Sequence, residues 1–386
     1  MIFLRKIGIV NFENIRSYNN SEYLPVINRL LEEPVFLEAI NSYFEDYSII
    51  ELKEQLLSYR TINEFQSNFV CRFIYEIEKR SISQITFKGL ENINEEKGAR
   101  LFISNHRDIV LDSALINFGL DKYKMNTCEI AIGSNLLGIP WVKDLVRLNK
   151  SFIVQRNVPK QEMLAASIQL SSYIQYTLLE NKQSIWIAQR EGRAKDGNDK
   201  TNPGVLKMFA LSSDINLIDF YKNMNITPVS ISYEYDPCDE LKITELLAKE
   251  NGESYVKRPN EDVQHMVRGI QGKKGNIKIT FSNLINDRIE EFRDITNRNE
   301  IIKRIASIID KEVYLNYHLW PTNYIAYDLL NNSNEFKSKY TFNKKEDFIC
   351  YVKEKLTSIN QNNDDARRLF LSMYANPVKN RLEALS

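Results

Sequence analysis

Apolar residues recur every three to four positions at both ends of the chain, and this spacing predicts amphipathic helices there. Near the N-terminus the helical period occupies residues 22–44, 49–60 and 62–80. Near the C-terminus it returns at residues 297–320 and 345–359. We therefore predict a helical N-terminal region over residues 1–82 and a helical C-terminal extension over residues 291–386.

The pattern between these regions is different, because short alternating or continuously apolar runs there predict strands. These runs lie at residues 83–93, 99–105, 128–133, 151–155, 184–189, 225–235 and 276–282. Helical patterns lie between them, notably at residues 109–120 and 163–180. Strands that alternate with helices predict an α/β domain over residues 83–290, with a sheet layered by helices.

Composition narrows the class of protein. The chain has 386 residues, is 43% apolar and carries no formal net charge, so we expect no nucleic-acid partner. The four cysteines are scattered, which favours reduced, mostly buried thiols in a cytoplasmic protein and argues against a metal site. They are Cys71, Cys128, Cys238 and Cys350.

The chain has no obvious targeting or membrane-spanning segment. Its first residues show no small-residue cleavage site, so we expect no cleaved leader. No uncharged run reaches the ~18 residues that a bilayer span requires, and the nearest is the stretch 130–142. A position on the membrane surface stays open.

The stretch ISNHRDIVLDS, residues 103–113, concentrates the candidate chemistry. Its H-R-D letters match the start of a protein-kinase catalytic loop, which needs Asn five positions after the Asp to hold magnesium. Position five after Asp108 is Ser113. No glycine-rich phosphate loop precedes the stretch and no D-F-G follows it, so we reject the kinase interpretation.

A second interpretation fits the surrounding elements better. A strand that ends at Ser104 and a helix that begins near Asp108 would place His106 at the carboxyl end of a buried strand, where open α/β sheets bind ligands. Asp108 and Asp112 are four residues apart, so either carboxylate could face the imidazole. A His held by a carboxylate is a general base, suited to deprotonating a substrate hydroxyl that attacks an activated acyl group.

Four blocks of sequence now resemble, in order, the motifs of the glycerol-3-phosphate and lysophosphatidic acid acyltransferase family. Residues 87–106, FKGLENINEEKGARLFISNH, are similar to the run that leads into the family motif N-H-x-x-x-x-D. Residues 133–157 resemble the second block, which ends in G-x-x-F-I-x-R. IWIAQREGRAKDG (185–197) is similar to F-P-E-G-T-R with S-R-D-G, and ITPVSISYE (226–234) resembles I-x-P-V-x-I.

The resemblance implies a mixed sheet flanked by helices and an O-acyl transfer with His106 as the base. Asp112 or Asp108 would orient it. Further residues would bind the acceptor, with Arg156 and Arg193 on its phosphate, where a planar guanidinium pairs well with phosphate oxygens. These substrate-binding candidates are Asn105, Arg156, Arg190, Glu191, Gly192 and Arg193.

The same resemblance sets expectations for partners. The donor would be acyl-CoA or acyl carrier protein, with no metal and no other cofactor. Lysophosphatidic acid is our first choice of acceptor, glycerol 3-phosphate the second and a phosphate-free lyso-aminolipid the third. We expect a peripheral protein on the inner face of the membrane, docked there through its helical N-terminal region. A catalytically inactive relative that binds lipid or carrier protein is the alternative from another class.

The motifs also depart from the family pattern. Five residues separate His106 from Asp112 where the family has four, and the expected position holds Leu111. We favour Asp112 as the partner and keep Asp108 open, since Asp108 also suits a helix N-cap. The third block reads E-G-R and is one residue short, and Lys150 stands where the family often has Gly. The remaining histidines, His265 and His318, match no block, and we expect them to be incidental.

Overall fold

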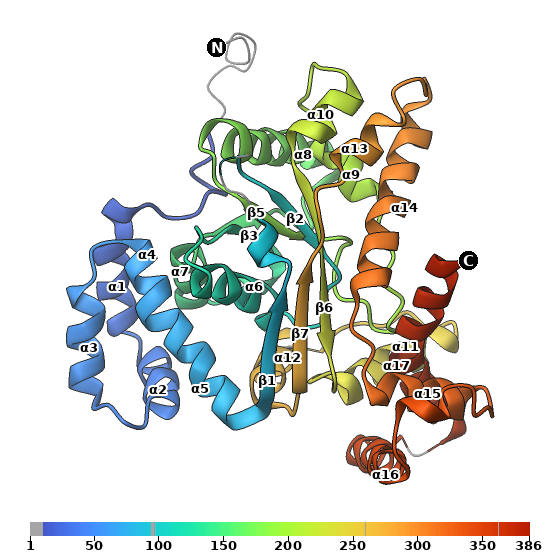
Figure 1. Ribbon diagram of the computed structural model, residues 1–386. Helices are drawn as coiled ribbons and strands as arrows, with labels where there is room; N and C mark the ends of the chain where they lie inside the picture. The colour runs from blue at the N-terminus through green and yellow to red at the C-terminus, as the bar shows by residue number, and fades with distance from the viewer. Residues whose placement is uncertain (1–10, 94–95, 97, 259, 362) are drawn as a thin grey trace.

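A seven-stranded mixed sheet forms the centre of the protein (Figure 1). The computed structural model describes residues 11–93, 96, 98–258, 260–361 and 363–386, so the first residues of the predicted N-terminal region lie outside the described part. The strand order is β1-β7-β6-β2-β5-β3-β4. The strands are β1 (Ile82–Lys88), β2 (Leu101–Ser104), β3 (Glu129–Gly133), β4 (Ser151–Val154), β5 (Ile185–Ala188), β6 (Ile226–Tyr233) and β7 (Gly275–Phe281).

Strand direction decides where a site can form. β6, β2, β5, β3 and β4 run parallel to one another, whereas β7 is antiparallel to β6 and pairs in parallel with β1. The five parallel strands therefore end at one common edge, which we call the carboxyl edge. The segments that follow these strands meet there, as ligand-binding segments do in open α/β sheets.

Alternation along β2 divides the core between the two faces of the sheet. Leu101 and Ile103 point into a core shared with α8 (Lys160–Gln175), α9 (Pro203–Phe209) and α10 (Leu217–Asn223). Phe102 points the other way, into a core shared with α5 (Cys71–Ser81) and α6 (Leu111–Lys122). All residues of β2 and β6 are buried, as the continuous apolar runs predict for central strands.

The N-terminal helices have a separate apolar core, which also packs on α7 (Pro140–Leu148). Periodicity predicts one helical stretch over residues 22–44, but two helices form there and the second begins at Pro34. Proline is favoured in the first turn of a helix and breaks a helix when it lies in the interior. Apart from α5, the helices of this region are α1 (Tyr23–Leu31), α2 (Pro34–Tyr43), α3 (Ile49–Ser58) and α4 (Ile62–Phe65).

The C-terminal helices follow α11 (Asp239–Glu250), α12 (Glu261–Gln271) and α13 (Asn286–Glu290). They are α14 (Arg298–Asn316), α15 (Pro321–Leu330), α16 (Phe342–Ser358) and α17 (Asp364–Leu385). α14 contributes Ile305 and Ile309 to the same core as Leu101 and Ile103, so the first helix of the extension covers the sheet itself. The mixed sheet with helices on both faces and helical regions at both ends confirms the predicted fold class.

Two expectations from composition can be compared with the structure. Three of the four free thiols are buried and Cys350 is exposed. Within the described ranges, no helix combines enough length with enough apolar character to cross a bilayer.

Candidate active site

His106 lies at the carboxyl edge, directly after β2, and contacts a carboxylate. Its Nδ1 is 2.8 Å from Oδ2 of Asp112, in the first turn of α6. The side chain of His106 is 14% exposed and that of Asp112 is fully buried. A carboxylate can only accept hydrogen bonds. Nδ1 of His106 therefore carries the proton that it donates to Asp112, and Nε2 is left as the basic nitrogen.

Asp112 is held by four donors. Besides the imidazole, Oδ2 accepts the backbone N–H groups of Arg107 at 2.6 Å and Asp108 at 3.0 Å. The hydroxyl of Tyr233 donates to Oδ1 at 2.8 Å. Burial by itself raises the pKa of Asp112, but the hydrogen bonds from His106 and from the backbone outweigh it and leave the pKa below its ordinary value. The carboxylate is therefore ionised and able to orient the imidazole.

The other carboxylate of the motif, Asp108, bonds to the backbone and not to the imidazole. Oδ1 of Asp108 accepts the backbone N–H groups of Val110 at 2.9 Å and Leu111 at 2.8 Å, which caps the start of α6. Burial and the nearby charge of Asp112 raise the pKa of Asp108. Of the two alternatives left open by the sequence, the structure places Asp112 on the imidazole and Asp108 at the helix cap.

The residues beside His106 hold the turn between β2 and α6 in place, and we call this turn the corner. Asn105 is fully buried, and its side-chain amide bonds to both the N–H and the carbonyl of Ile231 on β6, at 2.8 and 2.9 Å. These contacts make Asn105 a link between the residues after β2 and strand β6, and its expected part in substrate binding stays a prediction. Trp186 of β5 packs edge-on to the imidazole at 5.7 Å between ring centres and donates to Ser104 Oγ at 2.9 Å.

Arg156 and Glu191 meet across the carboxyl edge. Arg156 follows β4, which is three strands from β2, so its backbone is ~14 Å from that of His106 at the usual strand spacing. Its guanidinium reaches back over β3 and pairs with Glu191, which follows β5. The Arg156 side chain is 29% exposed and that of Glu191 is 70% exposed, so an incoming anion can displace this pair at low cost.

The third block lies against the catalytic corner. The N–H of Ala194 donates to the carbonyl of His106 at 3.2 Å, which fixes the segment after β5 beside the imidazole. Gly192 is exposed with φ +70°, a conformation that favours glycine. Arg193 donates from Nη2 to Nδ1 of His265 on α12 at 2.7 Å, and its buried Nη1 has no hydrogen-bond partner in the described part of the chain. Arg190 is half-buried in the same segment.

His265 therefore contacts a candidate site residue, although it matches none of the sequence motifs. Its imidazole is buried, and burial together with the adjacent Arg193 guanidinium lowers its pKa to about 4. A neutral ring at neutral pH can accept from the guanidinium through Nδ1. The expectation that His265 is incidental is wrong for its structural role, since this residue anchors one of the two candidate phosphate-binding arginines.

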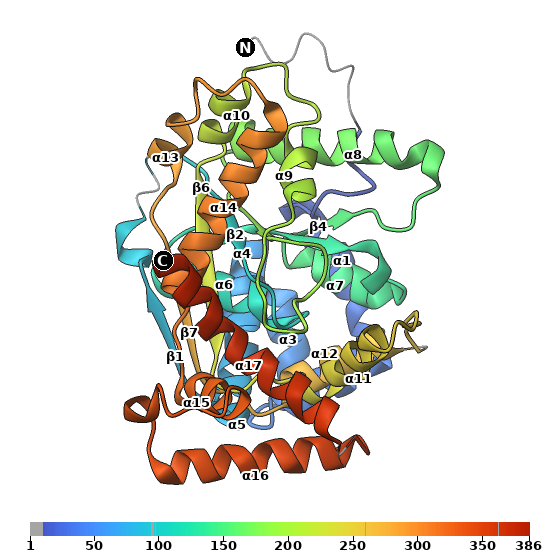
Figure 2. The same ribbon diagram turned by 90° about the vertical axis from the view of Figure 1, so that its right-hand side faces the viewer.

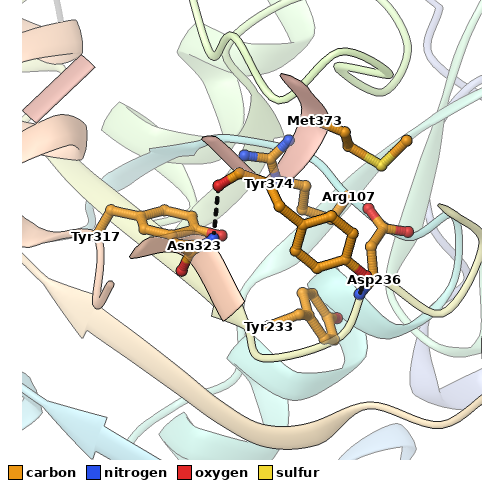
Figure 3. Close-up of a pocket in the computed structure, with 7 residues that line it drawn as sticks. All are labelled: Arg107, Tyr233, Asp236, Tyr317, Asn323, Met373 and Tyr374. Atoms are coloured by element: carbon orange, nitrogen blue, oxygen red, sulfur yellow. Dashed lines mark hydrogen bonds between the residues drawn. The ribbon is translucent and has the colours of Figure 1, made fainter. Parts of the chain in front are cut away.

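The C-terminal extension forms the wall behind the corner (Figure 3). The buried guanidinium of Arg107 pairs with Asp199 at 2.5 Å and stacks on the ring of Tyr317, 5.7 Å from its centre. The hydroxyl of Tyr374 on α17 accepts from the N–H of Asp236 at 3.0 Å, just beyond β6. The space between these residues is about 10 Å³, roughly the size of one water. It is lined by Arg107, Tyr233, Asp236, Tyr317, Asn323, Met373 and Tyr374.

A larger hollow of about 360 Å³ lies away from this corner, near the residues that precede β2 and β6 and around Lys182 and Lys222. These residues belong to the opposite edge of the sheet, where the parallel strands begin. The larger hollow is therefore not the place where His106 would meet a substrate.

Several contributors to the site carry no motif letter. Tyr233 ends β6 and Trp186 lies within β5, and these two strands flank β2. The blocks that contain both residues were found in the sequence, but their facing positions follow only from the strand order. Alternation along each strand would have selected them once that order was known.

Comparison with known proteins supports acyl transfer in general. Residues 84–232 match the model of the Acyltransferase family. No curated protein matches the chain. Among solved structures, the chain is similar to the 1-acyl-sn-glycerophosphate (LPA) acyltransferase PlsC from Thermotoga maritima, with 13% identity and a TM-score of 0.36. That similarity covers 76% of this chain and 97% of the other, and it is too weak to decide substrate or mechanism.

The family match spans β1 to β6 and includes every candidate residue from Asn105 to Arg193. The region of the chain that carries these residues therefore matches an acyltransferase domain.

Proposed function

We propose that the protein transfers a fatty acyl chain from a thioester donor, acyl-CoA or acyl carrier protein, to a hydroxyl of lysophosphatidic acid or glycerol 3-phosphate. The observation that carries this proposal is the contact between His106 and the ionised Asp112, on a domain whose family is acyl-transferring. This pair lacks a nucleophile of its own, so the attacking oxygen is that of the acceptor.

The reaction follows from the free nitrogen of the imidazole. Nε2 of His106 takes the proton from the acceptor hydroxyl while the oxygen attacks the thioester carbonyl. The carboxylate of Asp112 stabilises the imidazolium that forms. Collapse of the tetrahedral intermediate breaks the carbon–sulfur bond, and the leaving thiolate takes the proton back from Nε2. The imidazole supplies the base, so the proposal calls for no metal and no cofactor beyond the donor.

Two arginines support a phosphate-bearing acceptor. Arg193 has an unpartnered buried Nη1 in the described part of the chain, and a buried donor without an acceptor favours an incoming anion. Arg156 pairs with the exposed Glu191, and a phosphate dianion competes well for a guanidinium. The segments that carry both arginines leave the same sheet edge as His106.

The test is acyl transfer by the purified protein, with the product read by mass. Labelled acyl-CoA and acyl carrier protein are supplied separately, each with lysophosphatidic acid, glycerol 3-phosphate or a lyso-aminolipid. We expect transfer to a phosphate-bearing acceptor, which His106→Ala abolishes and Arg156→Ala weakens mainly through KM. Transfer only to the lyso-aminolipid, unaffected by Arg156→Ala, would contradict the assigned acceptor. Binding of lysolipid without turnover would favour an inactive relative.

A further inference from the structure

The first half of α8 is an exposed helix with apolar side chains. From Lys160 onward the first buried side chain is Leu170. In this half, Met163 is 52% exposed, Leu164 63% and Ile168 39%. Figure 2 shows this end of α8 projecting from the body of the protein. Because a protruding helix gains little from tertiary packing, polar residues are expected at such positions, and a cluster of large apolar ones indicates a contact surface.

Two other elements that carry exposed apolar side chains lie on the same side of the molecule. Figure 2 shows α7 and the tip of the α11–α12 hairpin facing the same way as the free end of α8. Ile139, in the turn before α7, is 38% exposed. Val263 and Val267 are 39% and 47% exposed and lie four residues apart on one face of α12. We call these three residues, together with the three α8 residues, the apolar face; its three parts lie on α8, before α7 and on α12.

Each part of the apolar face is joined to the candidate active site. The segment between β3 and α7 holds Ser134, whose Oγ accepts from the N–H of Arg156 at 2.9 Å, before it reaches Ile139. α8 begins four residues after Arg156. α12 carries His265, which contacts Arg193. A flat partner on this face would therefore lie beside the two arginines proposed to bind the acceptor.

The charges around the apolar face favour an anionic partner. Exposed cations flank its three parts, namely Lys160 at the start of α8, Lys143 on α7 and Arg258 just before α12. The acidic neighbours are Glu162 on α8 and Asp262 beside Val263 on α12, and Asp262 is neutralised by an ion pair with Lys257. Apolar side chains bordered by lysine and arginine are the arrangement with which interfacial helices bind anionic lipid surfaces.

We propose that the apolar face seats the protein on an anionic bilayer, with the first half of α8 lying at the level of the headgroups. The choice of a lipid surface over a protein rests on the proposed function, because a lipid acceptor and product reside in that surface. The proposal also moves the docking site from the N-terminal helical region, where the sequence placed it, to the side of the carboxyl edge.

The test is flotation with phosphatidylcholine vesicles, with or without phosphatidylglycerol. One variant combines Met163→Gln, Leu164→Gln and Ile168→Gln. The matched control combines Val35→Gln and Ile50→Gln in the N-terminal helices, where the native side chains are 58% and 65% exposed. We expect the wild type to float with the anionic vesicles and the α8 variant to lose about tenfold or more of its vesicle partitioning. The control should float like the wild type, and circular dichroism checks that each variant is folded.

Three results would overturn the proposal. They are a wild type that stays unbound with both vesicles, an α8 variant that floats like the wild type, and a loss of flotation confined to the N-terminal control. A concentration-dependent dimer that the α8 variant abolishes, without vesicle binding, would assign the face to a second copy. Acyl transfer is measured separately with detergent-dispersed lysophosphatidic acid, where we expect the α8 variant to stay active. Failure of transfer with every acceptor refutes the proposed function and leaves the flotation result intact.

Discussion

Tyr233 donates a hydrogen bond to the carboxylate of Asp112, and no sequence motif indicates this donor. Removal of its hydroxyl tests whether the orientation of this carboxylate matters for catalysis. Tyr233→Phe deletes one oxygen from a residue that is 3% exposed, so the ring still fills its site. The lost bond is a 2.8 Å contact to Oδ1 of Asp112. Oδ2 keeps its three N–H donors, including His106. The carboxylate should remain ionised but rotate more freely.

The magnitude follows from this geometry. A hydrogen bond to a buried charge contributes about 1.5–3 kcal/mol to stability, so the free energy of unfolding should fall by that amount. We expect about half of this loss to be felt in the transition state, because the imidazole is less well oriented, and kcat should fall about three- to tenfold. KM should change little, because Tyr233 lies behind Asp112 and away from the substrate side of His106.

The assay compares kcat and KM for acyl transfer with urea unfolding in the same preparations. Tyr221→Phe is the matched control, since its buried hydroxyl donates to the carbonyl of Leu206 at 2.7 Å, in the core on the other side of the sheet. The control should lose stability and keep kcat. If Tyr233→Phe also kept kcat while losing stability, the hydroxyl would be only structural and the reasoning about carboxylate orientation would be refuted.

Three further predictions concern stability. The buried Lys274 donates to three oxygens at 2.7–2.8 Å although burial lowers its pKa to about 8, so Lys274→Met should lower the free energy of unfolding by about 2–3 kcal/mol in urea titrations. His265 has a pKa of about 4 against an ordinary 6.5, so the stability it gives is complete above pH 6.5 and is lost as the pH falls toward 4. Urea titrations should show about 3 kcal/mol of this loss in the wild type by pH 4 and a flatter profile in His265→Gln. Gly197→Ala should lower Tm far more than Gly192→Ala, since both have positive φ but only the first Cβ would collide with the Met373 carbonyl, at 2.0 Å.

Much of the sheet could be predicted from the sequence because each strand is a short apolar run. All seven predicted strands are present, and the N-H motif lies at the end of one of them. The break at Pro34 was missed because apolar spacing continues through it, although proline carries the signal. Strand order could not be read from periodicity, which describes a strand's faces and not its neighbours.

The same limit applies to the candidate site. The motif spacing left two carboxylates near His106, and only the backbone path showed that Asp108 bonds to the helix start while Asp112 reaches the imidazole. The contacts of Arg107 and Tyr374 join segments more than 100 residues apart, so no local pattern signals them. The division into three domains stays a prediction, and α14 packs against the sheet although it was assigned to the extension.

The central claim is that His106 acts as the base because Asp112 orients it. The most direct test is the turnover of Asp112→Asn beside that of Asp108→Asn, in the same acyl-transfer assay. Asparagine can still cap a helix, so Asp108→Asn should stay within about threefold of the wild type. Asp112→Asn removes the charge that selects the tautomer and should lower kcat by about 10³-fold or more. Equal losses in both variants, or an active Asp112→Asn, would contradict the account.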